Sequence, residues 1–403
     1  MQQIRVGFLS AQNYLDRTAW SGTLFYMQQA LQRRGLEVVY LGDPQGRSTW
    51  LQKLRRLSRK LHTLLRGSSD TQQQQQFADR VRRQLRQVEC DVIFAPVASS
   101  EVITLETETP LVYLSDATAK LIHYEYLREF ASSMKDIPTH DEALQQAEQA
   151  EAIAIAKAHC LVYPSSWAAR SAIADYGADQ GKVSVIQMGA NLENPPTTEE
   201  VLARRRPPAP GEPLRLLFIG SNWERKGGNI AYDMLLSLLD RGVDAELTIV
   251  GCVPPAKVRH PKLRVIPFLN KNLPRERQQL DDLFWQAHLF VLPTRAECYG
   301  MVLCESGAFG LPVLVAEVGG IPSVIMNGRN GYLFSLAANG SAYADVAIEL
   351  CSDPARYQKV VQTSREEYDQ RLNWDSWADH MKALLGALKT NANQHPRTPI
   401  GLT

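Results

Sequence analysis

Hydrophobic and polar positions along the chain alternate between short apolar runs and longer segments with helical periodicity. The runs at 4–10 and 37–41 are rich in β-branched residues, which is typical of strands. Between them, residues 24–34 carry a helical apolar stripe that stops at Gly35. Further strands are expected at 91–95, 111–114, 160–163 and 183–188. This alternation predicts a parallel sheet with helices on both faces.

The pattern stops at 191–213, NLENPPTTEEVLARRRPPAPGEP, which is rich in proline and charge and has the composition of a linker. It restarts at 214–220, where LRLLFIG resembles the IRVGFL of the first strand. More strands are expected at 246–251, 263–267, 289–293 and 312–316. The chain is therefore predicted to be α/β, with two doubly wound Rossmann-like domains facing a cleft.

These patterns divide the chain into five parts. The first domain is expected at 1–192, a linker at 193–213 and the second domain at 214–370. Residues 374–388 have a helical stripe that needs a partner surface, so a helix at 371–390 is expected to pack back on the first domain. Residues 391–403 are predicted to be disordered.

Composition narrows the class of protein. The net charge of the 403 residues is +1, which gives no reason to expect nucleic-acid binding. The six cysteines form no C-x-x-C pair and the eight histidines show no metal-ligand spacing, so no metal is predicted. The N-terminus reads as a strand and no long uncharged apolar run is present, so a cytoplasmic protein without a membrane span is expected.

The segment 46–67 is locally basic, with seven Lys or Arg and no acid around a helical leucine stripe. One interpretation is peripheral contact with anionic lipid on the inner membrane face, which would place the cleft beside a lipid-linked acceptor. The other is an ordinary domain helix that packs its leucines inward and keeps a solvated basic face. Both interpretations stay open at this point.

Two glutamates, Glu297 and Glu305, lie eight positions apart in RAECYGMVLCESGAFGLPVL. Glu297 falls in the loop at the carboxyl end of the predicted strand 289–293, where open α/β sheets bind ligands. The amides of Met301 and Val302 at the start of the next helix would bind phosphate, and Glu305 shares their helix face. Carboxylates beside a phosphate site suit a nucleotide joined to a sugar, because they accept hydrogen bonds from hydroxyls. The alternative is a pair of solvated acids near a helix start.

The segment ECYGMVLCE followed by GLPVLV resembles the E-x7-E signature of retaining glycosyltransferases of family 4, which have the GT-B fold. FIGSNWERKGG at 218–228 resembles the strand–Gly–Lys–Gly segment of that family. The resemblance implies a retaining transfer of a sugar from a nucleoside-diphosphate sugar to a glycan, lipid or small-molecule acceptor. It implies no cofactor and no metal, and UDP is expected ahead of GDP or ADP.

The resemblance also implies roles for individual residues. Glu297 is expected at the donor sugar and Glu305 at the ribose, while Asp116 would orient the acceptor and His123 is a further acceptor-side candidate. The acceptor would lie on the first domain and the donor on the second. The remaining expected donor-binding residues are Gly22, Arg225, Lys226, Phe268, Leu269, Tyr299, Gly300, Met301 and Val302.

Some positions depart from the family pattern. Ser221 stands where an arginine is common, so Arg225 is the expected substitute, and Cys298-Tyr299 replaces the usual Gly-Phe. Two other classes remain alternatives: a sugar-nucleotide epimerase or phosphorylase of similar architecture, and a non-catalytic protein that binds sugar nucleotides.

Overall fold

The computed structural model describes residues 3–42, 69–127 and 141–394. The basic segment 46–67 lies outside these ranges, so both interpretations of it stand as they were. Within the described ranges, no helix is long and apolar enough to cross a membrane.

The first domain is one six-stranded sheet with helices around it. Its elements are β1 (Arg5–Ser10), η1 (Ala19–Gly22), α1 (Thr23–Arg33), β2 (Glu37–Gly42), α3 (Ser69–Leu85), β3 (Val92–Pro96), α4 (Ser99–Ile103), β4 (Leu111–Leu114), α5 (Ala119–Leu121), η2 (Ile122–Leu127), α7 (Asp141–Lys157), β5 (Cys160–Tyr163), α8 (Ser166–Tyr176), η4 (Gln180–Lys182) and β6 (Val183–Val185).

The second domain has a sheet of the same size, and two long helices end the chain. After α9 (Thr198–Arg204) come β7 (Leu214–Ile219), α10 (Gly228–Asp240), β8 (Ala245–Val250), β9 (Leu263–Ile266), α11 (Pro274–Gln286), β10 (Leu289–Leu292), α12 (Met301–Ala308), β11 (Val313–Ala316), η5 (Ile321–Ser323), β12 (Tyr332–Phe334), α13 (Gly340–Ser352), α14 (Pro354–Arg371) and α15 (Trp374–Gln394).

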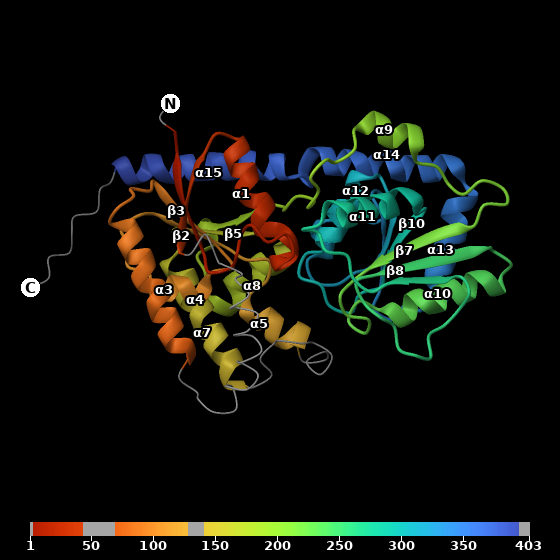
Figure 1. The fold of residues 1–403 in the computed structure, drawn as a ribbon, viewed down its shortest axis with the longest axis horizontal. Helices are drawn as coiled ribbons and strands as arrows, with labels where there is room; N and C mark the ends of the chain where they lie inside the picture. Colours follow the sequence, from red (N-terminus) through yellow and green to blue (C-terminus); the bar gives the residue numbers. More distant parts are fainter. Residues whose placement is uncertain (1–2, 43–68, 128–140, 395–403) are drawn as a thin grey trace, which may run out of the picture.

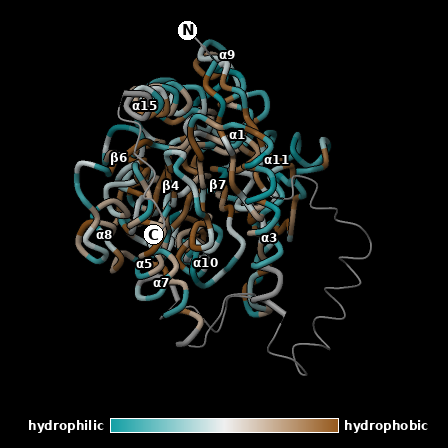
Figure 2. The backbone as a smooth tube through the Cα atoms, turned by 90° about the vertical axis from the view of Figure 1, so that its left-hand side faces the viewer, coloured by the Kyte–Doolittle hydropathy of each residue, from teal (hydrophilic) through white to brown (hydrophobic). Residues whose placement is uncertain are grey.

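Both sheets are parallel and doubly wound, which confirms the predicted fold class. Their strand orders are β2-β1-β3-β4-β5-β6 and β12-β11-β10-β7-β8-β9. Every position of β3, β4, β5, β10 and β11 is buried, as expected for strands covered by helices on both faces. Figure 2 shows hydrophobic residues running along strands such as β4 and β7 inside the molecule.

The structure differs from the predicted elements at three places. Residues 193–213 contain the helix α9, which begins with a capping box between Thr197 and Glu200 and buries Val201 completely. The strand β12 was not expected, because three residues are too short to show a period. The last helix continues to Gln394, so the predicted disordered tail begins inside α15, and 395–403 lie outside the described ranges.

The last helix returns to the first domain. In Figure 1, α14 lies over the second domain and α15 continues across the first, beside α1. Arg33 at the end of α1 pairs with Asp375 of α15, and Arg34, the next residue, pairs with Asp379. Trp377 of α15 is 1% exposed. The two domains are thus joined by α15 as well as by the segment that holds α9.

Candidate active site

The candidate site begins where the second sheet reverses its strand order. The strands β7 and β10 are neighbours, and the chain then builds outward from them on opposite sides. The loops that leave the carboxyl ends of strands at such a point form a ligand-binding crevice. One loop carries Arg225 and Lys226 and the other carries Glu297, so strand pairing joins groups that lie 71 residues apart.

Lys226 and Glu297 form an ion pair through Nζ and Oε2, and their side chains are 11% and 10% exposed. Burial alone would raise the pKa of Glu297, but the charges of Lys226 and Arg225 outweigh it and lower this pKa. Burial also lowers the pKa of Lys226, and Glu297 opposes that change. Glu297 is therefore an ionised carboxylate against a buried ammonium group and not a solvated acid near a helix start.

Arg225 forms hydrogen bonds that join the loop after β7 to the loop after β10. Its guanidinium donates to the carbonyl of Ala296 at 2.9 Å, while its own carbonyl accepts from the amide of Arg295 at 2.7 Å and the hydroxyl of Thr294 at 3.1 Å. The side chain is buried, with the residue 5% exposed. Arg225 thus positions the backbone around Glu297 in this structure.

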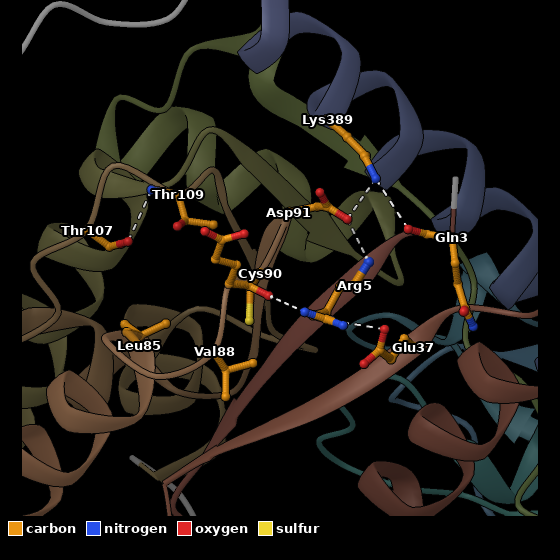
Figure 3. Close-up of a pocket in the computed structure, with 11 residues that line it drawn as sticks. Gln3, Arg5, Glu37, Leu85, Val88, Cys90, Asp91, Thr107, Thr109 and Lys389 are labelled. Carbon is orange, nitrogen blue, oxygen red and sulfur yellow. Dashed lines mark hydrogen bonds and ion pairs between the residues drawn. The ribbon is translucent and has the colours of Figure 1, made fainter. Parts of the chain in front are cut away.

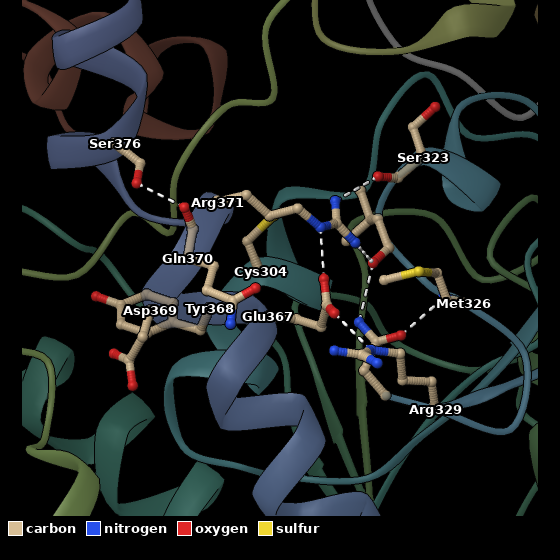
Figure 4. A network of polar contacts seen from close by, with 12 residues as sticks. Cys304, Ser323, Met326, Arg329, Glu367, Tyr368, Asp369, Gln370, Arg371 and Ser376 are labelled. Carbon is tan, nitrogen blue, oxygen red and sulfur yellow. Dashed lines mark hydrogen bonds and ion pairs between the residues drawn. The ribbon is translucent and has the colours of Figure 1, made fainter.

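The backbone of Glu297 lies in close contact with Gly319. A Cβ on Gly319 would lie 1.9 Å from the Glu297 carbonyl oxygen, and its φ is +57°. No side chain fits there, so the 319–320 turn fixes the loop from one side. Behind this turn, Arg371 donates to the carbonyls of Ser323 and Val324 at 2.7 and 3.0 Å and pairs with the buried Glu367, as Figure 4 shows.

The helix α12 starts at the same edge. Gly300 has a left-handed φ of +90° and precedes Met301, and the side chains of Met301 and Val302 are partly buried. Glu305 on this helix is 2% exposed and pairs with Lys271, whose Nζ lies 2.9 Å from Oε1. The structure therefore places both glutamates near the helix start, each against its own lysine.

Tyr299, which was expected at the donor, is turned toward the first domain. It is 1% exposed, and its hydroxyl donates to the Met188 carbonyl at 3.1 Å. Phe268 lies at the carboxyl end of β9 and is 63% exposed, while Leu269 packs against the core. Of these three side chains, Phe268 therefore presents the largest accessible apolar surface for a planar ligand group.

The first domain contributes a strained loop and an acid. Trp20, Ser21 and Gly22 have successive φ values of 43°, 58° and 90°, and a Cβ on Gly22 would lie 2.8 Å from the Arg17 carbonyl. The Trp20 indole N–H donates to Asp116 Oδ2 at 3.3 Å. Burial, with a smaller effect from the charge of Glu297, raises the pKa of Asp116 to about 6. Asp116 and Glu297 therefore approach each other from opposite domains.

His123 lies farther along the same segment, in η2. Its Nδ1 is 2.6 Å from Glu148 of α7, and its ring stacks on Tyr124 with centroids 4.5 Å apart. These contacts hold the imidazole against α7, and within the described part of the chain His123 makes no hydrogen bond or ion pair with Asp116 or Glu297. Among the acceptor-side candidates, Asp116 is the one coupled to the second domain.

Direct contacts join the domains beside the site. The side chain of Asn272 accepts from the Arg17 amide at 3.0 Å and donates to Asp16 at 2.8 Å. Glu193 pairs with Arg17 at 2.9 Å and with Arg277 at 2.7 Å. We call this group of five residues the interdomain clamp.

A separate polar cavity of ≈ 570 Å³ lies at the opposite, amino end of the first sheet (Figure 3). Its cations are already engaged, because Arg5 pairs with Glu37 and Lys389 pairs with Asp91, both at 2.9 Å. It is remote in topology from the loops that carry Glu297 and Asp116.

Sequence reasoning missed two residues of the site. Lys271 follows β9, and its position at the carboxyl end of a strand was the only signal that could have marked it. Trp20 follows β1 in the same way, but nothing local predicts that its indole reaches Asp116 across 96 positions.

The comparisons with known proteins agree with this geometry. Residues 213–353 match the family described as Glycosyl transferases group 1, which covers most of the second domain. A D-inositol 3-phosphate glycosyltransferase of Streptomyces avermitilis is 28% identical over 258 residues, 60% of this chain and 55% of the relative. One from Nocardiopsis dassonvillei is 30% identical over 220 residues, 51% and 50% of the two chains. The matches thus span about half the length of these curated relatives.

Solved structures match over nearly the whole chain. Sucrose-phosphate synthase from Thermosynechococcus elongatus has a TM-score of 0.66 at 15% identity, covering 96% of this chain and 100% of that one. Anabaena HepE in complex with UDP-glucose has a TM-score of 0.61 at 13% identity, with the same two coverages. At such identities the likeness shows the fold. The chain therefore has the two-domain GT-B fold of glycosyltransferases, and its second domain matches the Glycosyl transferases group 1 family.

Proposed function

We propose that this protein is a retaining glycosyltransferase that moves a sugar from a nucleoside-diphosphate sugar to a glycan, lipid or small-molecule acceptor. The observation that carries the proposal is the buried Lys226–Glu297 pair at the switch point of the second sheet, beside the start of α12. An ammonium group, helix amides and two carboxylates suit a ligand that joins phosphates to hydroxyls. The names of the relatives and the UDP-glucose complex of a structural neighbour support the same class, with UDP ahead of GDP or ADP.

In the proposed reaction, the bond between the anomeric carbon and the diphosphate oxygen breaks and the acceptor oxygen bonds to the same face of that carbon. Lys226 and the amides of Met301 and Val302 would stabilise the charge that develops on the diphosphate, without a metal. Glu297 would stabilise the positive charge on the sugar, and Glu305 would hold the ribose. Asp116 would orient the acceptor hydroxyl, whose proton passes to the departing diphosphate oxygen on the same face as the new bond forms.

Donor binding requires the two internal ion pairs to rearrange. In the structure Lys226 pairs with Glu297, and Lys271 pairs with Glu305. The phosphate and hydroxyl groups of an incoming donor would replace these contacts. A pair that is exchanged for an equivalent set of contacts loses less free energy than one that is simply broken. This arrangement keeps two buried carboxylates neutralised in the absence of donor.

A thermal-shift panel of UDP-, GDP- and ADP-sugars tests the donor class. A donor present at 100 times its Kd adds about 2.7 kcal/mol to the free energy of unfolding, which gives a clear rise in Tm. Lys226→Ala should lose most of that rise for every nucleoside diphosphate, because a charge-assisted phosphate contact is worth roughly 1.5–3 kcal/mol. No stabilisation by any sugar nucleotide would contradict the proposed donor class.

The stereochemistry is tested separately on the product. NMR of product formed from any accepted donor should show the donor's anomeric configuration, and an inverted product would contradict the retaining mechanism. Recovery of an epimerised donor in place of a transfer product would favour the epimerase alternative.

Peripheral membrane contact of 46–67 stays a proposal of its own. Its support is the local charge, seven Lys or Arg without an acid. In flotation with anionic and neutral vesicles, binding that requires anionic lipid supports it, and equal, negligible binding to both supports an ordinary packed helix.

A further inference from the structure

The loop that carries Asp116 is held from behind by buried side chains of α7 and α8. Glu151 of α7 is 3% exposed. Its Oε1 accepts from the Tyr113 hydroxyl at 3.1 Å, and its Oε2 accepts from the Ala119 amide at 2.5 Å. Thr118, between Asp116 and the helix α5, shares a 2.7 Å hydrogen bond with Ser171 of α8. These contacts fix both sides of residues 115–119.

The buried surroundings of Glu151 disfavour the ionised form of its carboxyl group. Its two donors are a phenol and a backbone amide, both neutral, and burial raises its pKa to about 7. The nearby charge of Asp116 raises this pKa as well. A glutamine could fill the same space without that cost, with its oxygen accepting from the Ala119 amide and its amide nitrogen donating to a reoriented Tyr113 hydroxyl. The presence of an acid here therefore calls for a role beyond packing.

We propose that Glu151 is a positioning residue, whose carboxylate holds the 115–119 loop so that Asp116 faces Glu297 across the boundary between the domains. The proposal rests on the proposed function for its consequence in catalysis. Its structural part, that Glu151 sets the place of Asp116 and adds a second titrating group beside it, can be tested without any turnover.

Other titratable groups also face the two acids. Glu297 and Cys298 approach Asp116 from the loop after β10, where the charge of Glu297 raises the pKa of Asp116. Tyr163 of β5 and Tyr176 of α8 surround Glu151, and burial raises the pKa of both phenols above 10, so they stay neutral near pH 7. Asp116 and Glu151 are thus expected to titrate as a coupled pair with apparent pKa values of about 6 and about 7.

The indole of Trp20 gives a direct readout, because its N–H donates to Asp116. The chain has 7 tryptophans, so a ¹⁵N-tryptophan spectrum is simple and Trp20→Phe assigns the signal. Between pH 5 and 8.5 the wild-type signal should move in two steps. Glu151→Gln should keep the first step and lose the second. Tyr113→Phe should move the second step to higher pH, because the lost hydrogen bond had lowered the pKa of Glu151.

Glu151→Ala should displace the Trp20 signal at every pH, because the loop loses its anchor. Glu101→Gln on α4 is the matched control, an acid of the same domain whose pKa burial also raises, and it should titrate like the wild type. A one-step wild-type titration that Glu151→Gln leaves unchanged overturns the proposal. Tm measurements show whether each variant folds. If Glu151→Ala does not fold, the titrations of Glu151→Gln and Tyr113→Phe still test the proposal.

The kinetic part of the test uses a donor identified by the thermal-shift panel of sugar nucleotides. Glu151→Ala should lower kcat by roughly 10- to 100-fold with donor KM within about twofold, because the loop lies on the first domain and the donor site on the second. Glu151→Gln should retain most of kcat and lose the pH dependence associated with the second step. Failure of every donor would count against the proposed function alone, since the Trp20 titration needs no substrate.

Discussion

At the scale of single residues, the two glutamates of the site differ in what they would contact. Glu305 pairs with Lys271 on the side expected to hold ribose, a part of the donor that barely changes in the reaction. Glu305→Gln should therefore raise donor KM more than it lowers kcat. Under the proposed roles, Glu297→Gln keeps the shape but removes the charge beside the reacting carbon, so kcat should fall roughly 10²–10³-fold with a smaller change in KM.

Steady-state kinetics with saturating acceptor measure this difference. Glu366→Gln, which changes a partly exposed acid on α14 of the same domain, is the matched control and should change neither constant. If Glu297→Gln and Glu305→Gln show the same kinetic signature, the assigned division of roles is wrong.

The buried ion pair also makes a prediction about stability. Lys226→Met leaves Glu297 charged and unpaired, which should reduce the free energy of unfolding by roughly 3–5 kcal/mol. The double variant Lys226→Met with Glu297→Gln removes both charges and should recover most of that loss. Urea unfolding of the four proteins in the cycle measures it, and simple additivity of the two changes would mean that the pair is not coupled.

At the scale of elements, His288 joins the starts of β7 and β10. It is 5% exposed, and its Nδ1 accepts from the Arg215 amide at 3.0 Å. Burial lowers its pKa to about 4, so the folded protein keeps a neutral imidazole where the unfolded chain takes up a proton below about 6.5. Proton binding by the unfolded state favours unfolding, so this site should lose about 2 kcal/mol of stability between pH 7 and pH 5.

His288→Asn offers the matching test, because its amide oxygen can accept the same Arg215 hydrogen bond and does not titrate. Urea unfolding at pH 7 and pH 5 should show a smaller loss for the variant than for the wild type. Equal losses in the two proteins would rule out His288 as the source of this pH dependence.

At the scale of the whole molecule, the interdomain clamp should favour the arrangement seen in the structure, in which the two domains touch beside the site. Glu193 accepts from arginines of both domains, and exposed pairs of this kind contribute about 0–1 kcal/mol each. Glu193→Gln should therefore increase the population of open molecules by several-fold and raise the radius of gyration measured by solution X-ray scattering. Under the proposed function, a bound donor should reverse the change by bridging the boundary between the domains.

Asp379→Asn is the control for this measurement, because it removes the same charge from an exposed pair between α15 and α1, away from the clamp. Scattering curves that are identical for Glu193→Gln and the wild type without donor would show that the clamp does not hold the domains.

The sequence by itself determined the two α/β domains and the loops that carry the site. Strands such as β4, β5 and β10 are short apolar runs whose period needs no tertiary information, and the α/β alternation dictates parallel sheets. Because ligands bind at the carboxyl ends of such strands, the loop with Glu297 could be chosen from the pattern alone, and the family resemblance pointed to Lys226 and Asp116. The capping box of α9 was equally local, and it was missed because proline and charge dominate that segment.

Only the tertiary structure decided which groups meet. Lys226 and Glu297 lie 71 positions apart, Lys271 and Glu305 lie 34 apart, and Trp20 and Asp116 lie 96 apart, so each pair depends on strand order and on how the domains sit together. Burial, which sets the pKa of Asp116 and Glu151, likewise arises from elements distant in sequence. The physical reason is that charge and dielectric act through space, whereas periodicity acts along the chain.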